Sequence, residues 1–176
     1  MTKPSKSGGN LSKPVLISYI NGFLGPGDIV LDIGCGTKEI ANNLTCAQVV
    51  TLDIWEPFKP DIWCDLTQIP KLPCEDSTFK MVLLIDVIEH LPKDKGFKIL
   101  REAQRVTSKY IILLTPLWWD ANTQLMEDPE SPYYKNEFDK HLSLWTPEDL
   151  PRFKQIKTLE VFQDYFLGVW EKDAPI

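Results

Sequence analysis

The sequence predicts an α/β fold, a mostly parallel sheet with helices on both faces and a C-terminal antiparallel hairpin. Short continuous apolar runs alternate with amphipathic stretches through the first two-thirds of the chain, as in sheets whose strands are joined by helical crossovers. Two of these runs carry an aspartate at or near their ends, and the first leads into a Gly-x-Gly turn. Near the C-terminus, residues 155–162 and 165–170 are β-rich and alternating, and lie close enough to form the hairpin.

Local signals place the first elements in order. Ser12, a typical N-cap residue, begins an amphipathic helix that the turn Gly25-Pro26-Gly27 ends. Ile29–Ile33 has the apolar character of a strand buried on both faces. Lys38–Leu44 leaves room for only a short helix, and Ala47–Ile54 is the second strand.

The same alternation continues along the chain. Asp61–Cys64 is a brief third strand, and Phe79–Val87 is a longer fourth strand with an acid near its end. Asp94–Val106 gathers its apolar residues on one helical face, so it is predicted to be a helix. Tyr110–Leu114 is the fifth strand.

The segment Leu117–Leu144 breaks this rhythm because no helical or strand period runs through it. Irregular segments of this length are usually lids or binding loops, and this one leaves the carboxyl end of a central strand, where ligands bind in open α/β sheets. We predict an active-site lid, and a hydrophobic surface patch or dimer contact is the alternative. The aromatic residues behind both interpretations are Trp118, Trp119, Tyr133, Tyr134 and Phe138.

Composition indicates one globular domain over residues 11–176, preceded by a flexible tail over residues 1–10. The net charge of −6 disfavours a broad phosphate-binding surface, so we expect no nucleic-acid partner. The tail lacks the apolar core of a signal peptide and no run approaches a membrane span, which predicts a cytoplasmic protein without membrane contact. The sequence leaves monomer and homodimer open as alternatives. The four cysteines form no Cys-x-x-Cys pair and the chain has two histidines, so we expect buried reduced thiols and no metal.

The stretch Val30-Leu31-Asp32-Ile33-Gly34-Cys35-Gly36, read with Asp53, points to a nucleoside-bearing cofactor. Glycines let the backbone approach such a ligand, and an acid at the end of the second strand accepts hydrogen bonds from ribose hydroxyls. A dinucleotide site would want a third glycine where Glu39 stands, and Asp32 would repel a pyrophosphate. S-adenosylmethionine has an ammonium and a sulfonium and no phosphate, so Asp32 favours it, although a salt-bridge role is the simpler alternative.

With these residues the chain resembles the class I S-adenosylmethionine-dependent methyltransferases, and most closely the small-molecule branch that includes quinone-biosynthesis enzymes. The resemblance spans residues 14–170 and implies a Rossmann-like sheet with S-adenosyl-L-methionine as cofactor. Its motifs assign cofactor contacts to Asp32, Gly34, Cys35 and Gly36 in the first turn, to Asp53 and Ile54 at the ribose and adenine, to Asp65 and Leu66 at the adenine, and to Asp86 and Val87 at the methionine end.

Simpler interpretations stand beside two of these assignments, and the chain departs from the family pattern at two places. Asp65 would also start a turn, and Asp86 would also cap the turn that follows it. Many relatives have glycine where Lys38 stands, so the first turn is expected to close differently. The segment Trp55–Pro60 is too short and too rich in proline for the usual helix.

Methyl transfer from a sulfonium needs alignment and exclusion of water more than a catalytic triad. Asp86-Val87-Ile88-Glu89 stands where enzymes acting on nucleobase or glutamine amino groups have an Asn/Asp-Pro-Pro-Tyr/Phe tetrapeptide, so a small-molecule methyl acceptor is favoured. His141 and His90 are the candidate general bases, although His90 would equally satisfy backbone groups and His141 would equally pin the lid. A non-catalytic methyltransferase-like module and a nicotinamide-dependent oxidoreductase are the alternative functions.

Overall fold

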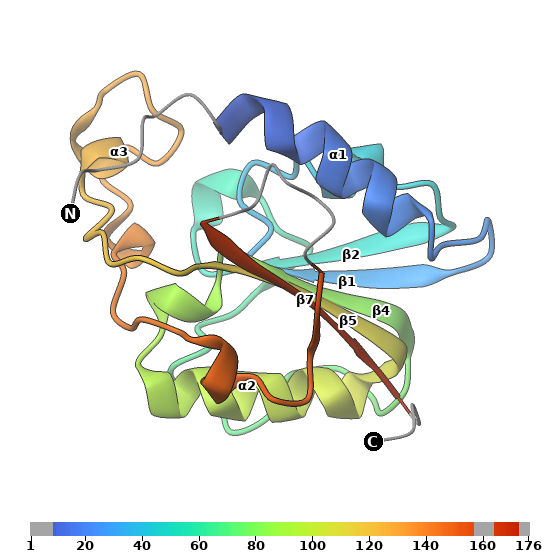
Figure 1. Ribbon diagram of the computed structural model, residues 1–176. Coiled ribbons are helices and arrows are strands. Elements are labelled where there is room, and N and C mark those ends of the chain that lie inside the picture. The colour runs from blue at the N-terminus through green and yellow to red at the C-terminus, as the bar shows by residue number, and fades with distance from the viewer. Residues whose placement is uncertain (1–8, 157–163, 173–176) are drawn as a thin grey trace.

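A computed structural model of the chain describes residues 9–156 and 164–172, and it has one seven-stranded sheet with the order β3-β2-β1-β4-β5-β7-β6 (Figure 1). Neighbouring strands from β3 to β5 are parallel, and β7 is antiparallel to both β5 and β6. This is the predicted α/β sheet with its C-terminal antiparallel pair. The strands are β1 (Ile29–Ile33), β2 (Gln48–Asp53), β3 (Ile62–Trp63), β4 (Phe79–Ile85), β5 (Thr107–Pro116), β6 (Lys154–Gln155) and β7 (Tyr165–Glu171).

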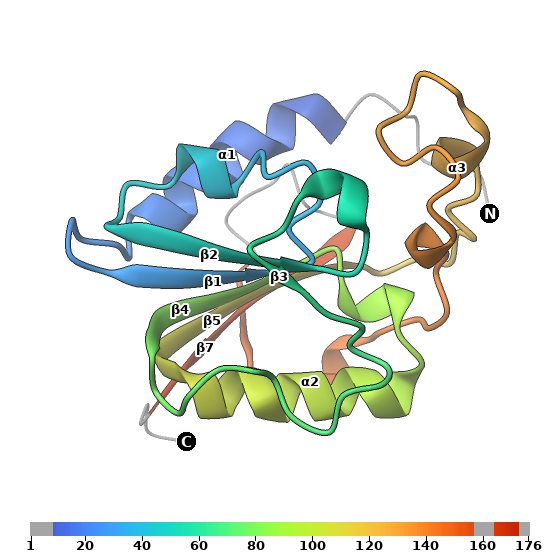
Figure 2. The same ribbon diagram turned by 180° about the vertical axis from the view of Figure 1, so that it is seen from behind.

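Helices cover both faces of the sheet, as Figures 1 and 2 show from opposite sides. Helix α1 (Gly9–Asn21) packs Leu16 and Ile20 onto one face, and α2 (Lys93–Val106) packs its apolar side onto the other. Successive side chains of a strand point to opposite faces, so Val30 belongs to the first layer and Leu31 to the second. Burial on both sides explains why the strands are continuous apolar runs.

Two helix predictions are corrected by the structure. Helix α1 begins at Gly9, so Ser12 lies inside it and does not cap it. Pro14 also lies within the helix, where it has no backbone N–H to donate. The predicted helix over Lys38–Leu44 is reduced to the single 3-10 turn Ala41–Asn43. Lys38 has a φ of 61°, and this left-handed conformation cannot be part of a right-handed helix.

Parts of other predictions lie outside the described residues. This holds for residues 1–8 of the predicted tail and for residues 157–162 of the first hairpin strand. All four cysteines are free thiols; Cys35 and Cys64 are buried as predicted, whereas Cys46 and Cys74 are only half-buried. Within residues 9–156 and 164–172, no helix combines the length and apolarity needed to cross a bilayer.

Candidate active site

The carboxyl ends of β1, β2 and β4 open into one cavity of about 600 Å³. All of the candidate residues named from the sequence line it, although they come from four turns and from the segment Leu117–Leu144. They are Asp32, Gly34, Cys35, Gly36, Asp53, Ile54, Asp65, Leu66, Asp86, Val87, His90 and His141. The structure therefore brings these residues together, while their individual roles stay predictions.

The turn after β1 is shaped by two glycines with positive φ angles, 69° at Gly34 and 51° at Gly36. A Cβ atom on Gly34 would lie 2.6 Å from Cγ2 of Val87, so a side chain there would collide with the turn after β4. A Cβ on Gly36 would meet the side chain of Tyr133, whose hydroxyl oxygen would lie 3.0 Å away. Gly34 and Gly36 therefore leave the backbone without side chains along one wall of the cavity.

Asp53 links this turn to the end of β2. Its Oδ2 accepts a hydrogen bond from the Gly36 N–H at 2.9 Å, and its Oδ1 accepts one from the Trp55 N–H at 2.8 Å. A carboxylate oxygen has two lone pairs, so each oxygen can still accept a bond from a ligand hydroxyl. Asp53 is thereby held by the backbone at the place where the sequence predicted a ribose contact.

Asp32 is almost completely buried beneath this turn. Burial, assisted by the negative charge of Asp53, raises the pKa of Asp32 to about 7. A nearby cation would favour the ionised carboxylate and lower that pKa. Cys35 lies beside it, and burial with the charges of Asp53 and Asp32 raises the pKa of its thiol to about 12, so the thiol is protonated at neutral pH.

The turn after β3 confirms that Asp65 starts a turn, while its adenine contact stays a prediction. Its Oδ1 accepts hydrogen bonds from the N–H and the hydroxyl of Thr67, at 2.8 and 2.7 Å, which fixes a turn. Asp65 also lines the cavity, together with Leu66 and Ile54. We call Asp32, Gly34, Gly36, Asp53 and Asp65 the glycine side of the cavity.

The turn after β4 starts at Asp86, which has a φ of 53°. Asp86 lines the cavity and is exposed to solvent there, and desolvation by the surrounding protein raises its pKa to about 6. The 3-10 turn η3 (Ile88–His90) follows and carries two more polar residues into the wall. We call Asp86, Glu89, His90 and His141 the histidine side of the cavity.

Glu89 is a site residue that the sequence prediction missed. Only 1% of it is exposed; its Oε2 accepts a bond from the Thr115 hydroxyl at 3.0 Å, and its Oε1 has no hydrogen-bond partner among the described residues. Burial and the neighbouring Asp86 raise its pKa well above the ordinary value. The run Asp86-Val87-Ile88-Glu89-His90 carries predicted roles in cofactor binding, acceptor class and general-base catalysis, but none of them falls to Glu89 itself. An acid beside a histidine on such a turn was the available signal.

His90 and His141 face each other edge to face, with ring centroids 4.8 Å apart. Nδ1 of His90 lies 3.3 Å from the carbonyl oxygen of Lys140. Burial lowers the pKa of both rings, that of His90 to about 4, so both are neutral at pH 7. Each ring therefore keeps one unprotonated nitrogen.

His141 reaches this position because the end of its segment is firmly anchored. Trp145 is fully buried, and its indole N–H donates to the carbonyl oxygen of Ile88 at 3.0 Å. The carbonyl oxygen of Glu89 accepts bonds from the N–H groups of Leu142 and Ser143. Backbone contacts on both elements thus hold residues 141–145 against η3.

The segment Leu117–Leu144 has little regular structure beyond the short helix α3 (Gln124–Glu127) and a 3-10 turn at Glu137–Asp139. It crosses to the turn after β2, where its Tyr133 contacts Phe58 and its Phe138 lies near Trp55. Figure 1 shows the segment at one end of the sheet.

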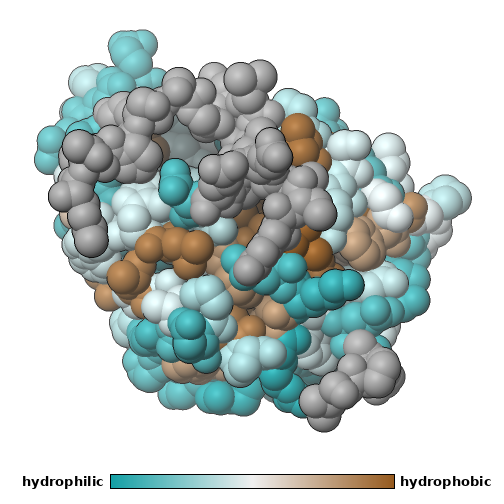
Figure 3. Space-filling view, viewed as in Figure 1, coloured by the Kyte–Doolittle hydropathy of each residue, from teal (hydrophilic) through white to brown (hydrophobic). Residues whose placement is uncertain are grey.

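The segment also leaves apolar side chains in solvent, so the dimer-contact alternative is still open. Figure 3 shows hydrophobic residues gathered among hydrophilic ones on one face of the molecule. The segment's exposed large apolar side chains are Trp119, Leu125, Tyr134, Phe138, Leu142 and Leu144.

The cavity is lined by many acids and few bases. Its two lysines are Lys13 and Lys140, and both histidines are neutral. A cavity with this balance suits a cationic ligand, and the bare turn at Gly34 and Gly36 leaves room for one. The acidic residues are Asp32, Glu39, Asp53, Asp65, Asp86, Glu89, Asp120, Glu137 and Asp139.

Comparisons with known proteins agree with this geometry. A family model described as a methyltransferase domain matches residues 31–113. A SAM-dependent methyltransferase from Archaeoglobus fulgidus is similar to the chain, with 18% identity, a TM-score of 0.58, and 93% of this chain and 94% of that chain covered. One from Methanosarcina mazei has 18% identity and a TM-score of 0.57, covering 88% and 96%. No match was found among curated proteins.

Magnesium protoporphyrin IX methyltransferase from Synechocystis, solved with bound SAH, is similar at 16% identity and a TM-score of 0.57, covering 93% of this chain and 83% of that chain. At such identities the structural likeness concerns the fold, and the family match adds the motif region. Residues 31–113 therefore match the methyltransferase domain family, and the chain has the fold of the class I, S-adenosylmethionine-dependent methyltransferases. S-adenosylmethionine is its cofactor, and the fold, family and cofactor predictions are confirmed.

Proposed function

We propose that this methyltransferase acts on a small-molecule acceptor that enters the histidine side of the cavity while the cofactor lies along the glycine side. The observation that supports this most strongly is the acid-rich cavity at the strand ends, to whose lining the irregular segment Leu117–Leu144 contributes. Its negative charge attracts a cationic cofactor and disfavours a polyanionic acceptor.

Each group on the glycine side would make a contact of a different kind. Asp53 would accept hydrogen bonds from the ribose hydroxyls, and Asp65 with the apolar Ile54 and Leu66 would surround the adenine. Asp32 would compensate the ammonium of the methionine part. Asp86, near the start of η3, would lie beside the end that carries the sulfonium.

When bound, S-adenosylmethionine supplies an electrophilic methyl carbon on a positively charged sulfur. The task left to the protein is to align an acceptor atom with that carbon and to exclude water, effects worth roughly 7–11 kcal/mol of barrier. The polar groups of the histidine side would orient the acceptor.

The segment Leu117–Leu144 would act as the lid over this reaction. Its Tyr133 and Phe138 line the cavity and reach Phe58 and Trp55 after β2, and a lid that excludes water must make contacts of this kind. Hydrogen exchange of the segment should slow when S-adenosylhomocysteine and a methylatable acceptor are bound together. Equal exchange with and without these ligands would contradict the lid, and finding the segment's aromatic side chains packed against a second subunit would then assign it to a dimer contact.

A screen of metabolite mixtures with methyl-labelled S-adenosylmethionine tests the proposed function. Transfer of label to a compound of low molecular mass, abolished by removal of the protein, is the expected result. Label found only in added RNA, DNA or protein would contradict the small-molecule acceptor. Tight S-adenosylhomocysteine binding with no transfer to any acceptor would indicate the non-catalytic module.

A further inference from the structure

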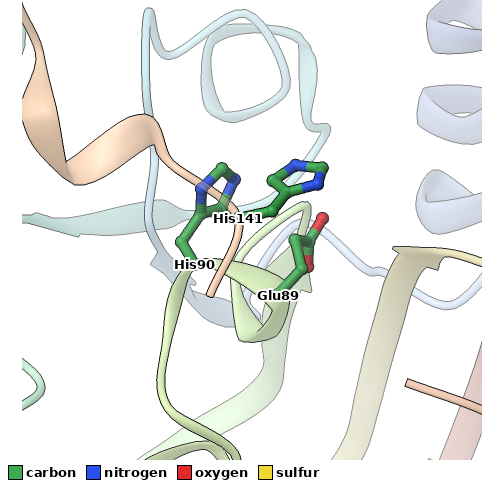
Figure 4. A group of neighbouring side chains, drawn as sticks. All are labelled: Glu89, His90 and His141. Atoms are coloured by element: carbon green, nitrogen blue, oxygen red, sulfur yellow. The ribbon is translucent and has the colours of Figure 1, made fainter. Parts of the chain in front are cut away.

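We propose that Glu89, His90 and His141 form a binding site for a divalent first-row transition-metal ion such as Zn²⁺. One ligand atom from each of these residues lies within 4.8 Å of the others. Figure 4 shows Glu89 and His90 rising from the same turn and the ring of His141 beside them. The cysteine and histidine spacings gave no sign of this cluster because its third member is 51 residues further along the chain.

The buried carboxylate of Glu89 supplies a second, independent reason for a ligand here. Oε1 of Glu89 is inaccessible and has no hydrogen-bond partner among the described residues. Such an orphaned acceptor costs free energy unless something pairs with it. No lysine or arginine forms an ion pair with Glu89 within the described part of the chain, so a bound cation would be the partner that keeps this buried carboxylate ionised.

The histidine contacts leave the correct nitrogen available. A carbonyl oxygen can only accept a hydrogen bond, so Nδ1 of His90 carries its proton toward Lys140 and Nε2 keeps its lone pair. Metal-ligating histidines characteristically donate their other ring N–H to a backbone carbonyl or carboxylate in this way. His141 likewise lies against the backbone of Asp120.

The ligand set defines the class of ion. Two imidazoles and one carboxylate suit Zn²⁺ and its first-row neighbours, whereas Mg²⁺ and Ca²⁺ prefer oxygen ligands alone. Ligand atoms around a tetrahedral zinc lie about 3.4 Å apart, given bonds of about 2.0–2.1 Å, so small side-chain rotations would close the cluster. Three protein ligands leave a position open toward the cavity, to be filled by water or by a polar atom of another ligand.

This assignment makes the rings of His90 and His141 metal ligands and not the general bases predicted from the sequence.

Titration of the whole chain with ZnCl₂ and with CoCl₂, after chelator treatment, distinguishes the two roles. We expect one ion per chain and a Co²⁺ absorption spectrum without thiolate charge-transfer bands. The chain has only these two histidines, so nuclear magnetic resonance of the imidazole nitrogens should show both shifting with the metal.

Variants decide whether the cluster is the site. Glu89→Gln, which keeps the shape of the side chain, and His141→Ala, at a partly exposed ring, should each weaken Zn²⁺ binding by more than about 100-fold, beyond the 10–100-fold typical of outer-shell partners. Glu148→Gln, at an exposed acid outside the cavity, is the matched control and should bind as the unaltered chain does.

Several outcomes would overturn the proposal. These are no Zn²⁺ or Co²⁺ binding, unchanged affinity in both variants, or a thiolate spectrum. Binding of S-adenosylhomocysteine, measured on the same samples, keeps a failed metal site distinguishable from a failed cofactor site, and the melting curve of each variant verifies that it folds.

Discussion

The two sides of the cavity are built in opposite ways. The glycine side consists of strand ends and the turns that follow them. Its side chains are fixed by nearby backbone groups, as the Asp53 carboxylate is by hydrogen bonds from the N–H groups of Gly36 and Trp55. The histidine side is assembled from η3 and from a distant segment that Trp145 anchors. The first arrangement can be recognised from a short motif, whereas the second exists only once the chain has folded.

The difference suggests which features are general and which are particular to this protein. A turn that leaves backbone bare for a cofactor needs glycine and a strand-end acid, and little else. An acceptor site needs shape and polar groups that suit one substrate, and these come from segments that vary freely. Changes on the glycine side should therefore affect cofactor binding, and changes on the histidine side should leave it nearly intact.

The largest effect is expected at Gly34. Gly34→Ala would place a Cβ 2.6 Å from Val87 at a φ of 69°, so the turn must move and S-adenosylhomocysteine binding should become undetectable. The backbone strain should also lower the free energy of unfolding by about 1–3 kcal/mol. Gly27→Ala is the control, because nothing lies within 4 Å of its added Cβ, and calorimetry should find its affinity unchanged. Unaltered binding by Gly34→Ala would show that the turn does not approach the cofactor.

Asp53→Ala should have the next largest effect. Loss of hydrogen bonds to a charged acceptor costs about 1.5–3 kcal/mol, or roughly 10- to 150-fold in S-adenosylhomocysteine affinity. Asp61→Ala is a matched control, because Asp61 bonds to Thr51 outside the cavity and should change stability without changing affinity. Equal affinities for both variants would remove the ribose assignment.

Asp32 should produce the smallest effect, visible as a pH dependence. Because its pKa is about 7, most of the carboxyl is neutral at pH 6 and ionised at pH 8, so affinity for the cofactor's ammonium should rise about tenfold between those values. Asp32→Asn should abolish that rise. A slope that persists in the variant would assign the titration to another group.

Stability should respond to Asp32 in the opposite sense. A carboxyl whose folded pKa is raised from 3.8 to about 7 binds its proton more tightly in the folded state than in the unfolded state. The free energy of unfolding should therefore fall as the pH rises from 3.8 to about 7. Asp32→Asn removes the cost of burying the charge, and the variant should be the more stable protein above pH 7 while binding the cofactor less well.

The sequence was sufficient for the mostly parallel sheet with its C-terminal antiparallel pair, and for naming the residues that line the glycine side of the cavity. These depend on periodicity and on residues adjacent in the chain. It was insufficient where a single backbone conformation decides the outcome. Lys38 adopts a left-handed conformation at the position where many relatives have glycine, so no helix forms through it. Its amino group donates a hydrogen bond to the carbonyl oxygen of Lys59, which fixes the turn.

Glu89 shows the other limit of sequence reasoning. Its burial, its unpartnered side-chain oxygen and its position within 4.8 Å of the His141 ring nitrogen depend on how η3 packs against residues 141–145. No local sequence pattern predicts this packing, because it depends on the burial of Trp145 against Phe97 of α2.

A crystal structure of the chain with S-adenosylhomocysteine tests the central claim most directly. The account predicts the ribose hydroxyls on Asp53, the adenine between Ile54 and Leu66, and the homocysteine end between the turn at Gly34 and Asp86, with the sulfur directed to the histidine side. A ligand whose ribose does not contact Asp53, or one seated outside this cavity, would contradict it.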